Sequence, residues 1–416
     1  MSPAQLVDGV LAVARTQQRE VTRQPVYAVV LLLGLTLVAL SPALSVFSLG
    51  PAEVLVLDLG ASTLLFVAVF LAAAAVAAGT SERLSDGTLL QVLTRPIGPV
   101  GTLLGTWLGA SAALLQAALL MGVALQMAVR HGPHRAHWGV LVGALLALGG
   151  AAAWGVRQSL RERPFQPAAL TAGTVLLPAC YLLGLLWGPD LSLLAEPGMP
   201  DGTALAATWL AAMAAVAYAG LGLALATRLP PEGAAVLTLV GFLLGSVVQA
   251  GLGPEAESIG RLLGGGLLVV GGLWLLAQAF RAGPAWGAQA LLLPLGLAGA
   301  LGLLVSLPPA AEQWALLLGT PLLWLPFALA RWDEAGPPLL VYAAGLLVLG
   351  LGATVLEGGV LTLLVPDLQL FWIADAAYTG QLVPLAYCLE VSSSALLYAL
   401  GALAVGGASL LGRELG

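Results

Sequence analysis

Apolar segments long enough to cross a lipid bilayer recur along almost the whole chain. A transmembrane helix needs about 20 predominantly apolar residues. Windows of this kind occur about twelve times, near 26–46, 59–79, 98–128, 138–156, 167–188, 203–226, 233–252, 262–280, 286–307, 313–330, 337–356 and 385–411. Such runs favour helices, because a membrane-spanning barrel shows apolar residues at every second position instead. The sequence therefore predicts an all-α, polytopic helical membrane protein with about twelve transmembrane helices.

The composition agrees with a bilayer as the surrounding solvent. Hydrophobic residues make up 59% of the 416 residues and charged residues only 9%, whereas soluble domains carry about 25% charged residues. A water-soluble protein of this size has too little interior to hide so much apolar surface. All 15 basic residues are arginine, and no run of them is long enough to bind nucleic acid. We expect the lipid bilayer, and no nucleic acid, as a partner.

The arginines predict the orientation of the chain. Cytoplasmic loops of membrane proteins carry an excess of basic residues. If the N-terminus lies inside, twelve of the 15 arginines fall in cytoplasmic segments, and only Arg130, Arg135 and Arg261 fall in external loops. An even number of spans returns the C-terminus, with Arg413, to the same side. The predicted topology therefore has both termini in the cytoplasm.

A segment with helical periodicity, residues 1–24, precedes the first predicted span. Ser2 is the expected N-cap and Pro3 the first helical residue. Apolar residues then recur at helical spacing, at Leu6, Val7, Val10, Leu11 and Ala14. This pattern predicts an interfacial amphipathic helix lying on the membrane surface. The alternative is a simple extension of the first span into water.

A polar stretch between the second and third predicted spans leads into a short leucine-rich segment. Its notable residues are Glu82, Arg83, Asp86, Gly87, Thr88, Leu89, Leu93, Arg95 and Pro96. Because proline disfavours helix in the residue before it, a helix here should end near Thr94. The sequence predicts a short amphipathic helix over 82–94 on the cytoplasmic side, with its polar face toward the cytosol.

This stretch resembles the cytoplasmic coupling segment of type-2 ABC transporter permeases, including the bacterial ones grouped with multicopper-enzyme maturation. In that family, polar and acidic residues lead to Gly-Thr, leucine-rich turns and a proline followed by valine or isoleucine. The matching residues here are Glu82, Gly87, Thr88, Leu89, Leu93, Pro96, Ile97, Leu104 and Gly105. Two positions depart from the family pattern, since Thr106 replaces a lysine and Gly98-Pro99 replaces a segment that often carries a basic residue.

The C-terminal region resembles the same family. A Pro-x-Leu-Gln-x-Phe segment precedes a short external turn, and the last span ends in a basic-acidic pair. The corresponding residues are Pro366, Leu368, Gln369 and Phe371 for the external-turn motif, and Arg413-Glu414 for the pair. A looser likeness covers about 224–245, which resembles the short cytoplasmic elbow between the family's fourth and fifth spans.

The resemblance implies the membrane-spanning permease subunit of an ABC exporter in a bacterial cell (inner) membrane. Such a subunit moves its substrate, here unidentified, with ATP hydrolysed by a separate cytoplasmic ATPase subunit, and it pairs with a second copy or a sister permease. The chain itself is then not an enzyme and binds no cofactor, because ATP and Mg²⁺ lie on the ATPase. The absence of lysine agrees, because a phosphate-binding loop of the Gly-x-x-x-x-Gly-Lys type needs one.

The resemblance also implies a division of the chain. The expected parts are the interfacial helix 1–24, the N-terminal part of the permease core 25–128 with the coupling helix 82–94, core-like spans 203–252, and the external turn with the final span 360–416. Two stretches, 129–202 and 253–359, are additional to a six-span core.

Three smaller patterns each have two interpretations. Gly101, Gly105 and Gly109 share one face of the third span, which either allows close helix packing or reflects a glycine-rich composition. The three histidines, at positions 131, 134 and 137, are weak candidates for a metal site, and we expect a polar external loop without metal. Gln116, Gln126 and Gln249 either line a path or bond between helices, and Glu357 and Glu390 either serve transport or lie at the interface.

Two other functional classes compete with the exporter. A secondary active transporter without an ATPase partner needs charges at the membrane midplane and broken helices in paired repeats, and the sequence shows few such charges and no clear duplication. An intramembrane enzyme of the His-Glu-x-x-His or Gly-x-Ser-x-Gly type is not indicated, because neither motif occurs.

Overall fold

The computed structural model of the chain describes residues 3–45, 52–80, 98–132, 137–194, 198–243, 245, 366, 368–373 and 381–414. Within these ranges every regular element is a helix, and the only β pairing is an isolated bridge between Trp187 and Leu193. The predicted all-helical fold is therefore confirmed for this part of the chain.

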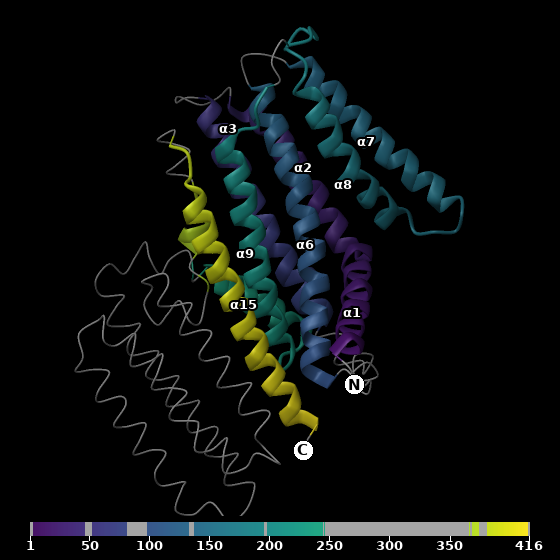
Figure 1. Ribbon diagram of the computed structural model, residues 1–416, viewed down its shortest axis with the longest axis vertical. Helices are drawn as coiled ribbons and strands as arrows, with labels where there is room; N and C mark the ends of the chain where they lie inside the picture. The colour runs from purple at the N-terminus through teal and green to yellow at the C-terminus, as the bar shows by residue number, and fades with distance from the viewer. Residues whose placement is uncertain are drawn as a thin grey trace, which may run out of the picture. The chain divides into compact units, whose positions relative to one another are not determined.

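The described part of the chain consists mainly of long helices (Figure 1). Their bounds are α1 Pro3–Arg23, α2 Pro25–Ser45, α3 Ala52–Leu71 with the π-helix η1 Ala72–Ala78, α6 Gly98–His131, α7 Trp138–Ser159, α8 Phe165–Gly184, α9 Gly202–Ala226, the 3-10 helix η4 Leu368–Phe371, and α15 Leu385–Glu414. A shorter apolar helix, Pro231–Leu243, follows α9.

Seven of the described helices are long and apolar enough to cross a membrane: Pro25–Ser45, Ala52–Ala77, Gly101–His131, Trp138–Ser159, Phe165–Gly184, Gly202–Ala226 and Leu385–Gly407. The hairpin of α7 and α8 exposes large apolar side chains, such as Leu145 at 70% and Val175 at 66%, and lipid is the solvent in which this is favourable. The chain is therefore a multi-pass membrane protein.

The predicted spans that fall on described residues agree with these helices, with two differences. The span expected at 59–79 begins earlier, at Ala52, and only the first part of the span expected at 233–252 is described, as Pro231–Leu243. The spans expected between 262 and 356 lie outside the described residues, so the count of twelve stays a prediction.

The chain divides into two compact units, residues 1–239 with 368–392, and residues 240–367 with 393–416. In the first unit α9 is the most buried helix, and it packs against α6, α3 and η1. Small side chains make this possible, because an added Cβ on Gly222 would lie 2.9 Å from the Cβ of Ala77. In the second unit, the described residues are mainly those of the second half of α15.

The first helix, α1, covers Pro3–Arg23 as predicted and packs along the beginning of α6. Gly105 approaches the backbone of Val10, and Gly109 approaches the carbonyl of Ala14, so the two helices run in the same direction. Close packing at two of the three glycines of the third span is thereby confirmed. Along α1, Val10 is buried whereas Val7 is exposed, so its apolar face is only partly covered by α6.

Candidate functional site

One end of the first unit gathers its arginines. The Gln166 side chain at the start of α8 donates hydrogen bonds to the carbonyls of Thr22 and Gln24, at 2.8 and 2.9 Å, and Gly79 packs against the side chain of Gln24. These contacts bring the α1–α2 junction, the α7–α8 turn and the end of η1 to one level. Seven of the eight arginines described in this unit are exposed on this side, namely Arg15, Arg19, Arg23, Arg157, Arg161, Arg163 and Arg228.

We call this the arginine-rich end. The remaining arginine, Arg130, lies near the far end of α6. Because α9 runs antiparallel to α6, with the Trp107 indole nitrogen donating to the Val216 carbonyl at 3.2 Å, the end of α9 and Arg228 belong to the arginine-rich end as well.

The chain leaves and re-enters the described bundle at this same end, because Thr80 follows η1 and Gly98 begins α6. The predicted coupling helix 82–94 and all nine predicted coupling residues, from Glu82 to Pro96, fall between these two points and lie outside the described residues.

The π-helix η1 leads directly to that segment. Its residues are alanine and valine, and Ala72, Ala73, Ala75, Val76 and Ala77 are fully buried. Ala77 packs with Ala226 and Ala234, beside Leu225 and Leu229. The π-helix is rare in proteins and is often found at functional sites. Here η1 packs the C-terminal end of α3 closely against the C-terminal end of α9.

Residues 368–371 of the external-turn motif lie at the opposite end of the first unit. Its 3-10 helix η4 packs against α9, and the Tyr387 hydroxyl donates to the Leu370 carbonyl at 2.8 Å. Phe371 is buried whereas Gln369 is exposed, so the phenylalanine packs and the glutamine faces outward. Pro366, the first residue of the motif, is also buried.

Gln126 ties three helices together at this end. Its side-chain oxygen accepts hydrogen bonds from the Asp201 backbone N–H at 2.9 Å and the Tyr181 hydroxyl at 3.0 Å, and its amide nitrogen donates to the Asp201 carbonyl at 2.8 Å. Gln116 makes a simpler bond, donating to the Thr174 hydroxyl at 2.8 Å. Both glutamines therefore bond between helices, one of the two roles that the sequence left open, and Gln249 lies outside the described residues.

We expect Gln126→Ala to destabilise the bundle more than Gln116→Ala. The first change removes three hydrogen bonds, among them that of the buried Tyr181 hydroxyl, whereas the second removes one. At about 0.6 kcal/mol for an interhelical hydrogen bond in a membrane, the losses are about 2 and about 0.6 kcal/mol. Reversible unfolding of the two purified variants in mixed micelles measures both values, and equal losses would contradict the role of Gln126.

Two of the three histidines bond within the protein near the same end. The Arg130 side-chain Nε donates to His137 Nε2 at 3.3 Å, and the His137 backbone N–H donates to His131 Nδ1 at 3.2 Å. Burial first, and then the neighbouring Arg130 and His131, lower the pKa of His137, which keeps its ring neutral and able to accept. Among the described residues no three metal-ligating side chains gather at one place, and His134 is outside them.

The candidate functional site is therefore the arginine-rich end, where η1 and α6 flank the segment 81–97. Comparison of the chain with protein-family models, with curated proteins and with solved structures finds no match.

Proposed function

We propose that the chain is the membrane-spanning permease subunit of an ABC exporter in a bacterial inner membrane, powered by a separate cytoplasmic ATPase. One observation carries this proposal. The segment with the likeness to a coupling helix is joined to the bundle, through Thr80 and Gly98, at the arginine-rich end. By the positive-inside rule that end faces the cytoplasm, where a soluble ATPase can reach it.

The packing around the segment supports a mechanical role. On one side the segment continues from η1, which packs on α9; on the other it continues into α6, which packs on α1. Movement of a helix over 82–94 would pass to these four elements as a rigid-body shift. The Ala77 contact with Gly222 and the Gly109 contact with Ala14 leave little free space to absorb it.

The opposite end is then external. There η4, the loop before α9 and the start of α15 gather, in agreement with the external turn that the family resemblance implies. With twelve spans, both termini lie in the cytoplasm, and a second copy or a sister permease completes the pathway.

The orientation can be tested by cysteine labelling. The chain has only two cysteines, Cys180 and Cys388, and serine at both positions provides a background for single cysteines at Ser85 and Ser192. A membrane-impermeant maleimide is expected to label the cysteine at position 85 only in inverted vesicles. It should label position 192, which is exposed in the loop between α8 and α9, only in intact cells.

Labelling of position 85 from outside the cell would overturn the exporter assignment, because no cytoplasmic ATPase could then contact the segment. Transport driven by a proton or sodium gradient in vesicles without ATP would favour the secondary transporter instead.

A further inference from the structure

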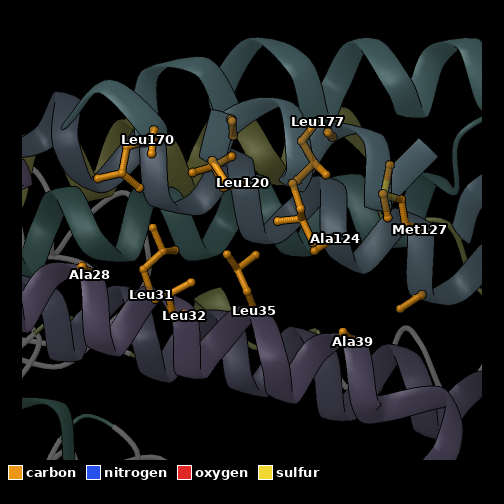
Figure 2. A pocket seen from close by; sticks show the side chains of 18 of the residues that line it. Ala28, Leu31, Leu32, Leu35, Ala39, Leu120, Ala124, Met127, Leu170 and Leu177 are labelled. Atoms are coloured by element: carbon orange, nitrogen blue, oxygen red, sulfur yellow. The ribbon is translucent and has the colours of Figure 1, made fainter. Parts of the chain in front are cut away.

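An apolar cavity of about 520 Å³ lies between α2, α6 and the α7–α8 hairpin (Figure 2). Leucine side chains of α2 and α8 face each other across it, among them Leu31 and Leu170, and Leu120 and Ala124 of α6 also line it. All of its lining residues are apolar except His131 at one end and Gln166 at the other. Such a lining excludes a polar ligand, because buried polar groups would find no hydrogen-bond partners there.

The cavity is elongated along the helices. Its lining on α2 runs from Ala28 to Pro42, which at about 1.5 Å per residue is a length of about 21 Å. This exceeds half of the roughly 30 Å hydrocarbon core of a bilayer. The length and the aliphatic walls fit a single extended hydrocarbon chain, and they do not fit a compact ring system.

The Gln166 end of the cavity lies beside exposed cationic side chains. Gln166 bonds to the carbonyl of Thr22, which precedes Arg23, and Phe165, which also lines the cavity, follows the turn that holds Arg161 and Arg163. All three arginines are exposed. Glu162 is the one acidic residue of this turn, so the turn and Arg23 together carry three positive charges and one negative charge near the Gln166 end.

We propose that this cavity holds one anionic phospholipid of the surrounding bilayer, with an acyl chain along α2 and its phosphate at Arg161 and Arg163. Basic sites between transmembrane helices are known places for anionic head groups. The hydrocarbon chain accounts for the apolar lining, and the phosphate accounts for the exposed arginines near the Gln166 end. The proposal does not depend on an ATPase partner. It assigns a lipid ligand to the α7–α8 hairpin, which is additional to a six-span core.

Native mass spectrometry of the full chain, with phosphatidylglycerol or phosphatidylcholine of the same acyl chains added, tests the site. The wild type should bind one phosphatidylglycerol in preference to phosphatidylcholine. The double variant Arg161→Gln, Arg163→Gln should lose this preference by roughly 30-fold, since each surface arginine contributes about a factor of five to the attraction of anionic lipid. Arg228→Gln, an exposed arginine away from the cavity, is the matched control and should retain the preference.

A second pair of variants tests the hydrocarbon chain. Ala144 lines the cavity, whereas Leu145 beside it is 70% exposed and does not. Ala144→Phe should fill the cavity and abolish tight binding of both lipids, and Leu145→Phe should leave binding unchanged. The proposal is overturned if both lipids bind equally to the wild type, if Ala144→Phe retains its lipid, or if Ala144→Phe instead separates a dimer in which a second copy of the chain filled the cavity.

Discussion

Gly109→Leu is expected to push α1 away from α6. A Cβ at Gly109 would collide with the carbonyl oxygen of Ala14 and would lie 2.7 Å from the Cβ of Gln17. Neither atom can turn aside, because one belongs to the backbone and the other is the first carbon of a buried side chain. Overpacking of this kind costs about 1–3 kcal/mol, and more where backbone must move. Unfolding of the purified variant in mixed micelles should show a loss at the upper end of that range.

Gly149→Leu is the matched control for this change. Gly149 lies within α7, and an added Cβ there meets nothing within 4 Å, so the same substitution adds an apolar side chain without a collision. An unchanged or slightly increased stability is expected. If both leucine variants lose the same stability, the close contact of α1 with α6 is not what Gly109 provides.

Under the proposed exporter function, Glu82→Arg is expected to abolish the stimulation of ATP hydrolysis in the partner ATPase. In the resemblance to type-2 permeases, Glu82 belongs to the polar face that contacts the ATPase, and reversing its charge places a cation at a contact adapted to an anion. Like charges set against each other across an interface cost several kcal/mol. ATP hydrolysis by the reconstituted complex should fall to the rate of the ATPase subunit alone.

Glu232→Arg separates this effect from a general change of charge. Glu232 is exposed at the start of the short helix after α9, near Arg228 at the arginine-rich end, and it is outside the predicted coupling helix. This variant should retain the stimulation, and Glu82→Arg should retain the melting temperature of the wild type. Full stimulation by a well-folded Glu82→Arg variant would rule out the coupling role.

The helices whose bounds were predicted well from the sequence are those whose bounds depend only on the hydropathy of their own residues. For α9 the prediction of 203–226 differs from the observed Gly202–Ala226 by one residue, because an uninterrupted apolar run ends in Thr227-Arg228. The start of α3 was predicted seven residues late, since Glu53 and Asp58 interrupt the hydropathy there. An acidic residue in the first turn of a helix is nevertheless favourable, because it faces the positive end of the helix dipole.

The partners of these helices could not be predicted in the same way. Helical spacing places Gly105 and Gly109 on one face, but nothing local to α6 indicates that α1 packs there. The cavity beneath the α7–α8 hairpin was also not predicted, because it depends on how four helices lie together. Gln126 was open to two interpretations for the same reason, since its partners Tyr181 and Asp201 come from elsewhere in the chain.

The break between α1 and α2 has a consequence for how the additional hairpin takes part in any motion. Gln24 is not helical, and it separates a helix packed on α6 from a helix that spans the membrane, so it is the natural hinge between the two. The Gln166 amide holds the carbonyl of Gln24 itself and that of Thr22 in the last turn of α1. A rotation of α1 relative to α2 must therefore either break these two hydrogen bonds or move α8 as well. The α7–α8 hairpin thus restrains motion between α1 and α2.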